Sequence, residues 1–594
     1  MSHVYDHANL DVHPVRRHGL DVILLSLLVL GVYASRITTP PLSGEETRWA
    51  RGGVEMIETG DWIVPRQQGR AFPERPPMNS WLMASAALAL GHMDPVAVRL
   101  PSVLAVWLTT LLIYAYSATL LSRLGAIASA AAYATAWQVM HIGGLGESEA
   151  VFAMFSSGSL LLWHWGYVRH WPAALVWPLG YSLAALAALT KGLQGPVYFV
   201  AVTSVFLLLR GDWRYYFRLA NLCGAMCLLA IVGAWQIPFY RATDAHAAHD
   251  IWFALVGDRL TLADLVMHVA TYPLETLACV APWSLLLLEL PRRRFREAIG
   301  EAASEVRPLV FFLLTAIAVT YPSVWFVAGA RGRYFMPLYP CLAILAGVVI
   351  ERGALAAVSS RQRRGWDTFL LGVAGAMVVA AIAIVGLSLA PIESLSQVRQ
   401  PLLFAILFAA AGACAAVVLL RARHSASPSR ATAAVWALAV FLGLSYNGAE
   451  KNVVDRMSND MGPLVAEAQQ EIPTPDHMVS FGPIFHRFAY FYGHTIPELP
   501  WPATLAEVPA DVTYFCFDQR PEDTPQRRIN GRGRINEFTP GTLPFEWDEI
   551  ARIPCGRSLR DDPRFCVIIG RVKREASNPR QATQSATEQS SQRR

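Results

Sequence analysis

Charged residues are scarce in this sequence. They make up only 16% of its 594 residues, whereas 54% are hydrophobic; an average soluble domain carries roughly 25% charged residues. Many of the hydrophobic residues lie in runs close to the length of about 20 residues that lets a helix cross the hydrocarbon layer of a bilayer. The composition argues against a soluble protein and predicts a mainly α-helical, polytopic membrane protein.

Cysteine is also rare, and the 8 cysteines exclude a disulfide scaffold. Five lie inside apolar runs, where small hydrophobic packing is their expected role: Cys223, Cys227, Cys279, Cys341 and Cys414. Cys555 and Cys566 could pair in an oxidising compartment, although a third cysteine nearby would be left over. The net charge of +5 comes from basic residues spread over short loops. No basic stripe predicts a nucleic-acid partner.

The apolar runs predict about thirteen transmembrane helices. The first, from about Asp21 to Ile37, has no small-residue cleavage site after it, so we interpret it as a retained helix and not as a signal peptide. The others lie near 97–119, 124–141, 150–167, 171–190, 195–209, 216–238, 273–290, 308–328, 334–350, 367–390, 401–420 and 432–446.

The arginines predict the orientation, because cytoplasmic loops are enriched in Lys and Arg. With a cytoplasmic N-terminus, the arginine-rich loops all fall inside: Arg123, Arg169, 210–218, 292–296, 361–364 and 421–430. The long first loop, 38–96, the loop around 239–272 and everything after about residue 446 then lie outside. We therefore expect the chemistry on the external face of the membrane.

Three parts follow from these patterns. Residues 1–446 form the transmembrane domain, and residues 447–574 are expected to form a small extracytoplasmic α/β domain. Strands are expected at 478–482, 512–517 and 567–572, where Val, Phe and Ile are frequent, and a helix is expected at 460–472. The tail, 575–594, is rich in Ser, Gln and Arg and is expected to be disordered.

The first external loop carries the strongest local signals. Ser43 and Glu46 have the spacing of a capping box, which predicts a helix that ends near Gly60. This helix would place Glu45 in its first turn, at the external mouth of the bundle; the alternative is that an acid there only complements the helix dipole. Further on, prolines hold Glu74 and Arg75 in a stiff backbone, either for a ligand or as a solvated turn with a local ion pair.

This loop resembles that of a known enzyme group. The motifs are Glu-Glu-Thr-Arg at 45–48, Gly-Asp-Trp-Ile-Val-Pro at 60–65, Glu-Arg-Pro-Pro at 74–77 and Trp81. In this order they are similar to the first external loop of the lipid A aminoarabinose transferases and the protein O-mannosyltransferases, which are GT-C-type glycosyltransferases. Weaker similarity continues at 99–101, 190–192, 282–284 and 333–337, with Pro340.

The resemblance implies a polyprenyl-phosphate sugar donor and an acceptor outside the bacterial inner membrane. The acceptor would be a glycolipid such as lipid A, a protein or a glycan, and the transfer would invert the anomeric carbon. The family usually has Asp at the position of Glu45 and Lys at that of Arg75. Both changes keep the charge but alter reach and hydrogen-bond geometry, so a non-catalytic homologue stays open as an alternative.

Transfer needs a base for the acceptor and cations for the departing phosphate. Glu45 is the first candidate for the base. A second acid is expected in the turn before the fourth span, where the family carries an acid six residues before a Phe; this matches Glu149, with Glu147 as the alternative. An acid at the edge of the hydrocarbon is costly unless it faces a watered cavity, which favours a site over a simple helix-start acid.

Residues that bind the donor phosphate or the substrate are expected on the same side. The candidates are Glu74, Arg75, Lys191, Arg331, Arg333 and Tyr334. Lys191 is one of only three lysines in the chain, although a lysine at the end of a membrane helix also snorkels to the interface. Arg331 and Arg333 lie on the side where positive charge is normally sparse.

Metal binding and transport are the remaining alternatives. His246 and His249 have a spacing that suits Zn²⁺, but polar helices produce such patterns readily, and the expected chemistry requires no cofactor while leaving room for a divalent metal. A lipid or solute transporter would carry ionisable residues at mid-membrane. Here the charges lie at the external helix ends, which favours the enzyme.

Overall fold

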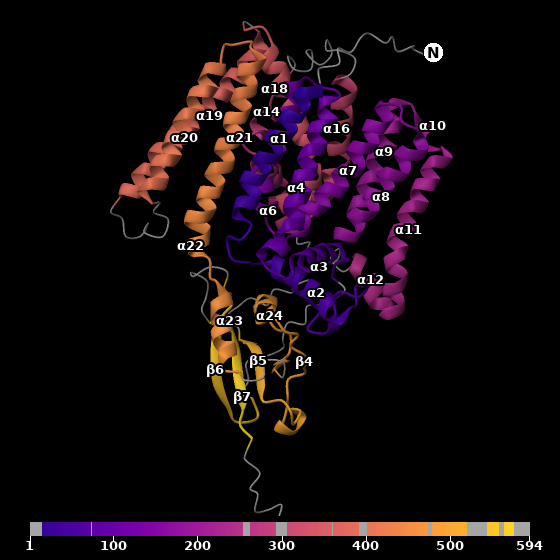
Figure 1. Cartoon of the computed structure of the whole chain (residues 1–594). Helices are drawn as coiled ribbons and strands as arrows, with labels where there is room; N and C mark the ends of the chain where they lie inside the picture. Colours follow the sequence, from indigo (N-terminus) through magenta and orange to yellow (C-terminus); the bar gives the residue numbers. More distant parts are fainter. Residues whose placement is uncertain are drawn as a thin grey trace, which may run out of the picture. The chain divides into compact units, whose positions relative to one another are not determined.

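The computed structural model describes residues 15–72, 74–253, 262–292, 306–358, 360–390, 401–472, 478–519, 543–556 and 564–574. The chain divides into two compact units (Figure 1). Unit 1 comprises Met1–Pro65 and Ala71–Ser458, and unit 2 comprises Arg66–Arg70 and Asn459–Arg594. The tail at 575–594, for which the sequence predicts disorder, lies outside the described residues.

Unit 1 is a helical bundle. Its longer helices are α1 (Val15–Tyr33), α4 (Pro95–Ala118), α5 (Arg123–Ala134), α7 (Ser148–Val168), α8 (Ala173–Lys191), α9 (Gln194–Arg210), α11 (Leu219–Ala242), α13 (Leu262–Cys279), α16 (Val306–Thr320), α18 (Tyr339–Leu355), α19 (Arg361–Leu389), α20 (Leu402–Ala422) and α21 (Pro428–Ala449). Shorter helices are α2 (Glu45–Thr59), α3 (Met78–Leu90), α6 (Trp137–Ile142), α10 (Trp213–Tyr216), α12 (Ala245–Phe253), α14 (Ser284–Leu287), α17 (Pro322–Trp325) and the 3₁₀ helix η2 (Gly332–Leu338). Figure 1 shows α2, α3 and α12 at one end of this bundle and α10 at the other.

Within the described part of the chain, nine helical segments are long and apolar enough to cross a membrane. Each coincides with one of the predicted spans, so the chain is a multi-pass membrane protein. The other predicted spans fall on α5 with α6, on α7, on α9 and on α13 with α14. The predicted span at 124–141 is broken at Thr135 and Ala136, where the backbone leaves the helical conformation.

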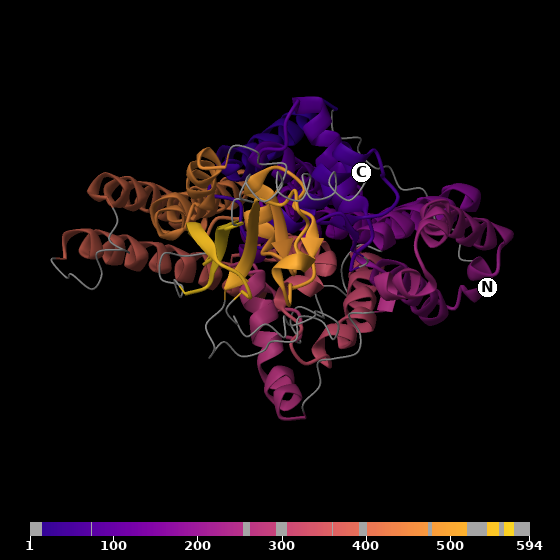
Figure 2. The ribbon, with the colours of Figure 1, turned by 90° about the horizontal axis from the view of Figure 1, so that it is seen from below.

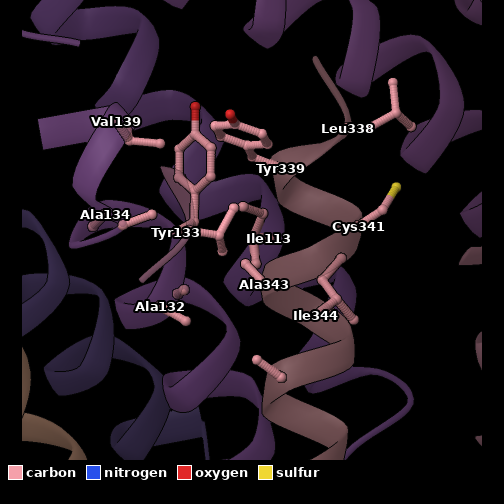
Figure 3. Close-up of a cluster of buried hydrophobic side chains, with 14 of the residues drawn as sticks. Ile113, Ala132, Tyr133, Ala134, Val139, Leu338, Tyr339, Cys341, Ala343 and Ile344 are labelled. Carbon is pink, nitrogen blue, oxygen red and sulfur yellow. The ribbon is translucent and has the colours of Figure 1, made fainter. Parts of the chain in front are cut away.

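The core of unit 1 depends on close helix packing between α5 and α18. A Cβ atom on Gly347 would lie 2.0 Å from Ser129 Oγ and 2.7 Å from the carbonyl oxygen of Gly125. Small residues at such crossings let two backbones approach and gain dispersion contacts. The larger side chains of Tyr133, near the end of α5, and Tyr339, at the start of α18, are buried at one end of this contact (Figure 3).

Unit 2 is a small α/β domain around a five-stranded sheet (Figure 2). The strand order is β4 (Glu498–Leu499), β3 (Met478–Phe481), β5 (Tyr514–Gln519), β7 (Cys566–Val572) and β6 (Trp547–Pro554). The first three strands are parallel, and β7 is antiparallel to both of its neighbours. Helices α23 (Met461–Gln470) and α24 (His486–Tyr492) complete the described part.

The predicted strands and the predicted helix of this domain are confirmed, because β3, β5, β7 and α23 fall on the expected residues. The disulfide considered for Cys555 and Cys566 does not form, and both are buried free thiols. Cys566 is the first residue of β7 and lies opposite Pro554, the last residue of β6, and Cys555 follows directly after Pro554. The Cys555 Sγ contacts the carbonyl oxygen of Ile553 at 3.7 Å.

A piece of the first loop belongs to unit 2. Strands β1 (Arg66–Gln67) and β2 (Arg70–Ala71) form a tight hairpin there. Gln68 Nε2 donates to Ser480 Oγ at 2.7 Å, and the Ile484 amide donates back to Gln68 Oε1 at 3.1 Å. Arg70 adds an ion pair with Glu498 at 2.8 Å. The tip of the first loop is therefore held by the C-terminal fold.

Candidate functional site

Helix α2 begins differently from the capping box that the sequence predicts. The helix and its stop at Gly60 are confirmed. However, the N-cap is Gly44, with a left-handed φ of 62°, and no side chain caps the helix. Only half of the box forms, in which the Ser43 amide donates to Glu46 Oε2 at 3.2 Å. The Ser43 hydroxyl takes no part, because the backbone turns at Gly44.

Glu46 has a larger role than the predicted cap. Its buried carboxylate receives Arg99 Nε at 2.7 Å and Arg99 Nη2 at 3.0 Å, and both side chains are excluded from solvent. The Gly146 amide donates to the same carboxylate at 2.7 Å. Arg99 also donates to the carbonyl oxygen of Ile37 at 3.1 Å. One carboxylate thus joins the start of α2, helix α4 and the turn before α7.

The predicted base Glu45 lies in a three-membered charge cluster. Arg48 Nη1 is 3.0 Å from Glu45 Oε2 and 3.4 Å from Glu74 Oε2. Burial raises the pKa of Glu74, the positive charge of Arg48 lowers it, and the Glu45 carboxylate raises it. The Glu45 side chain is 33% exposed, so its carboxylate remains open to a substrate.

Glycines build the turn that carries the second pair of acids. A Cβ on Gly144 would lie 2.9 Å from Arg36 Nη2, and a Cβ on Gly146 would lie 2.5 Å from Val98 Cγ1. No other residue type fits without displacing a neighbour. Arg36 is itself buried and donates to the carbonyl oxygens of Val32 and Met140. The turn is therefore packed rigidly against α1 and α4.

Glu147 and Glu149 follow this turn and meet two of the predicted cations. Lys191 Nζ is 2.9 Å from Glu149 Oε1. Arg333 Nη1 is 2.5 Å from Glu147 Oε2, and Arg333 Nε is 3.4 Å from Glu149 Oε1. Burial and the neighbouring Glu149 carboxylate raise the pKa of Glu147, whereas Arg333 lowers it. Gly192, at φ 99°, ends α8 directly after Lys191 and so leaves the lysine at the helix end.

Tyr334 completes this second cluster. Its ring lies 4.9 Å from Lys191 Nζ, which is a cation–π distance. The 3₁₀ helix that presents Arg333 and Tyr334 is fixed at Gly332, whose amide donates to Glu275 Oε1 at 2.6 Å. A Cβ on Gly332 would lie 2.4 Å from Cys279 Sγ, so this close approach to α13 requires glycine.

Arg75 stands between the two clusters. Its charge interacts with Glu149 and Tyr334 of one cluster and with Glu45 and Glu74 of the other. No hydrogen bond or ion pair joins its guanidinium to any residue that the structure describes, and burial lowers its pKa. A guanidinium that is partly desolvated and still unpaired is a ready anion site.

Two groups of predicted site residues lie elsewhere. The Arg331 side chain is exposed, and within the described residues only its carbonyl oxygen is engaged, by Tyr272 and by the Tyr334 amide. His246 and His249 are exposed on α12. Across the described residues, no group of three or more His, Cys, Asp and Glu side chains could hold a metal ion.

Comparisons with known proteins show what this chain is similar to. Residues 74–235 match the family model described as dolichyl-phosphate-mannose-protein mannosyltransferase. An undecaprenyl phosphate-α-4-amino-4-deoxy-L-arabinose arabinosyl transferase of Pseudomonas aeruginosa (strain LESB58) is 27% identical over 454 residues, which cover 73% of this chain and 76% of that protein. A second transferase of this name, from Proteus mirabilis, is 24% identical over 62% of this chain and 66% of its own length.

Among solved structures, ArnT from Cupriavidus metallidurans bound to undecaprenyl phosphate superposes with a TM-score of 0.65. The identity is 18%, and the match covers 93% of this chain and 98% of that one. This likeness shows the fold, and the relatives are arabinosyl transferases by name. The chain is a glycosyltransferase with a GT-C-type fold. The resemblance recognised in its first loop is confirmed.

Several residues of the candidate site have no role predicted for them from the sequence. Arg48 stands three residues after Glu45, a spacing that predicts a helical pair, and this signal could have placed it in the site. Arg99 and Arg36 have no such signal, because their partners are distant in sequence: Arg99 pairs with a residue 53 positions away, and Arg36 bonds the Met140 carbonyl 104 positions away.

Proposed function

We propose that this glycosyltransferase moves a sugar from a polyprenyl-phosphate donor to an acceptor on the external side of the membrane. The observation that carries the proposal is the Arg75 guanidinium, which lies between two clusters of acids and cations and has no hydrogen bond or ion pair with any described residue. The named relatives use undecaprenyl phosphate carrying 4-amino-4-deoxy-L-arabinose. That sugar, with a glycolipid such as lipid A as acceptor, is the first combination to test.

Glu45 is the proposed base. Its side chain is 33% exposed, whereas those of Glu147 and Glu149 are 11% and 5% exposed and are held by Arg333 and Lys191. A base must reach the proton that it removes. Glu147 and Glu149 instead position the two cations, because each carboxylate neutralises a charge that would otherwise repel its neighbour.

Arg75 is the proposed anchor of the donor phosphate, with Lys191, Arg333 and Tyr334 beside it. The acceptor oxygen attacks the anomeric carbon from the face opposite the phosphate, and Glu45 takes its proton as the new bond forms. The bond between the anomeric carbon and the phosphate oxygen breaks with its electron pair on the phosphate. Charge-assisted hydrogen bonds then stabilise the departing anion, and the configuration is inverted.

The topology completes the proposal. We infer thirteen membrane crossings with a cytoplasmic N-terminus, so that α2, the turn before α7 and the start of η2 lie at the external surface. Support comes from the nine long apolar helices, from the length of α7 and α9, and from the arginine-rich loops on the opposite side. Residues 447–574, including the sheet domain, then lie outside the membrane.

The test supplies purified protein in detergent with radiolabelled polyprenyl-phosphate sugars and candidate acceptors, and compares the wild type with Glu45→Gln. We expect transfer by the wild type, and a loss of about 10²–10⁴ in kcat for Glu45→Gln with little change in the KM for the donor. Retained transfer in the variant would remove Glu45 from the role of base. A wild type that transfers no sugar from any donor would favour a non-catalytic homologue.

A further inference from the structure

A second group of polar residues lies beside the site and takes no part in the mechanism above. It comprises His141 at the end of α6, Tyr446 near the end of α21, and Glu450 in the π-helical turn Glu450–Val454 that follows. We call this group the histidine relay. The Tyr446 hydroxyl donates to Glu450 Oε1, and His141 Nδ1 lies 3.1 Å from the same hydroxyl. Single π turns inside helices occur frequently at functional sites.

The order of donors fixes the tautomer of His141. Tyr446 has one hydroxyl proton, and it is given to the Glu450 carboxylate. The tyrosine oxygen can therefore only accept from the imidazole, so Nδ1 carries the ring proton. The other ring nitrogen, Nε2, is left as a hydrogen-bond acceptor, and none of the described residues donates to it.

The His141 side chain lies partly at the surface of the unit. The His141 side chain is 50% exposed, and Trp137, one helical turn earlier on the same face of α6, is 53% exposed. The Trp137 ring meets the Tyr446 ring edge-on, with centroids 5.5 Å apart. An exposed indole beside a half-exposed imidazole supplies the apolar surface and the polar anchor that ligand sites combine.

Neighbouring charges select the group that can bind. The Arg36 guanidinium covers the Tyr446 ring at 4.7 Å, and the Glu450 carboxylate lies 4.0 Å from His141 Nδ1. Because a positive and a negative group both lie beside the ring, their charges favour neither a cationic nor an anionic ligand. An unprotonated Nε2 cannot donate to a phosphate oxygen. The group that fits is a neutral donor, such as a sugar hydroxyl.

The relay is also tied to the candidate catalytic residues. His141 stands directly before the glycine turn that carries Glu147, and Arg333 acts on both side chains. Arg36 connects the two, since it packs against Gly144 of the turn and lies 4.0 Å from Glu450. A sugar ring bound at His141 would therefore lie near the turn that carries Glu147 and Glu149.

We propose that His141 and Trp137 form a saccharide subsite, in which His141 Nε2 accepts a hydrogen bond from a substrate hydroxyl and Trp137 covers the sugar face. Tyr446 and Glu450 are positioning residues that hold the imidazole in the required tautomer. The proposal rests on the proposed glycosyl transfer. The sugar belongs either to the lipid-linked donor or to the glycolipid acceptor, and the two KM values distinguish these sources.

The matched variants are His141→Asn and His141→Gln. An Asn side chain can replace the Nδ1 bond to Tyr446 but has no atom at the position of Nε2, whereas a Gln side chain can place its amide oxygen there. We expect His141→Asn to raise the KM of one substrate about tenfold, which is the effect of losing one neutral hydrogen bond, and to leave the other KM unchanged. His141→Gln should stay within about twofold of the wild type, and Trp137→Leu should raise the same KM as His141→Asn.

Tyr446→Phe tests the positioning role. It keeps the ring that packs against Trp137 and Arg36 and removes only the hydroxyl, so the imidazole no longer has a fixed tautomer. We expect the same KM to rise by less than in His141→Asn, and the His141→Asn Tyr446→Phe double variant to be no worse than His141→Asn alone. A purely structural contact would instead lower the melting temperature of both single variants and leave both KM values unchanged.

Equilibrium binding of labelled undecaprenyl-phosphate sugar and of lipid A to the purified full-length protein separates this proposal from the proposed function. Weaker binding of one of the two by His141→Asn but not by His141→Gln supports the subsite, even if the wild type transfers no sugar. The proposal is overturned if His141→Asn binds both as the wild type does, if both affinities fall together, or if Asn and Gln are equally impaired.

Discussion

Glu46 and Arg99 form a two-pronged ion pair that is shut off from solvent, with nitrogen-to-oxygen distances of 2.7 and 3.0 Å. The same carboxylate accepts the Gly146 amide. Glu45 is the residue before Glu46, and Glu147 is the residue after Gly146. Glu46, which takes no part in the proposed chemistry, therefore fixes the position of the exposed Glu45 relative to the buried Glu147 and Glu149.

Arg99→Met is expected to destabilise unit 1. It leaves the Glu46 carboxylate buried without its counter-ion, and breaking such a pair costs about 3–5 kcal/mol. Arg169→Met is the matched control, because Arg169 is exposed and, among the described residues, donates only to the Thr119 carbonyl oxygen. Thermal unfolding of the detergent-solubilised protein measures both. Equal melting temperatures for the two variants would show that the buried pair contributes nothing.

Unlike Arg99→Met, Arg75→Gln is expected to weaken donor binding without lowering the stability of the protein. Arg75 has no ion pair or hydrogen bond with any described residue, so its removal should leave the melting temperature unchanged or raise it. If the guanidinium holds the donor phosphate, the KM for the donor rises roughly ten- to a hundredfold, as expected for a lost charge-assisted hydrogen bond. Arg75→Lys should recover part of this. A destabilised Arg75→Gln with an unchanged donor KM would assign the residue to the fold.

Glu45→Asp tests the reach of the proposed base. The shorter side chain withdraws the carboxylate by one methylene and breaks its 3.0 Å contact with Arg48, while Arg48 keeps its 3.4 Å contact with Glu74. Since misplacement by about 1 Å can cost a hundredfold, we expect kcat to fall roughly ten- to a hundredfold, which is less than for Glu45→Gln. Single-turnover assays measure this step. An unchanged kcat would mean that the site adjusts to either length.

Local signals in the sequence predicted much of this molecule. Helix α2 and its stop at Gly60 follow from glycine and helical spacing, and the strands of unit 2 follow from runs of Val, Ile and Phe. The cations Lys191 and Arg333 were found because lysine is rare and arginine is unusual on that side. In each case a few neighbouring residues contain the information.

Long-range relationships could not be predicted in this way. The capping box suggested by Ser43 is only half formed because the backbone turns at Gly44, and the ion pair of Glu46 with Arg99, which belongs to another helix, has no local signal. His141 has no spacing signal, since its partner Tyr446 is 305 residues away. The break between α5 and α6 has no local cause in the apolar pattern, and only the packing of the bundle places it.

The pH dependence of donor binding should follow Glu74. Burial raises the pKa of this carboxyl, so the folded protein holds the proton more tightly than the unfolded chain does. The resulting stability is fully present below the ordinary pKa of a glutamate and is lost as the pH rises through the raised value. Glu74→Gln stays neutral, so it should be more stable than the wild type at neutral pH and equally stable in acid.

In the wild type, protonation of Glu74 also removes a negative charge from beside Arg75, so the KM for the donor should fall as the pH is lowered. The KM of Glu74→Gln should not change with pH. Glu58→Gln, at the far end of α2, is the control, and a Glu74→Gln profile that parallels the wild type would show that another group governs the pH dependence.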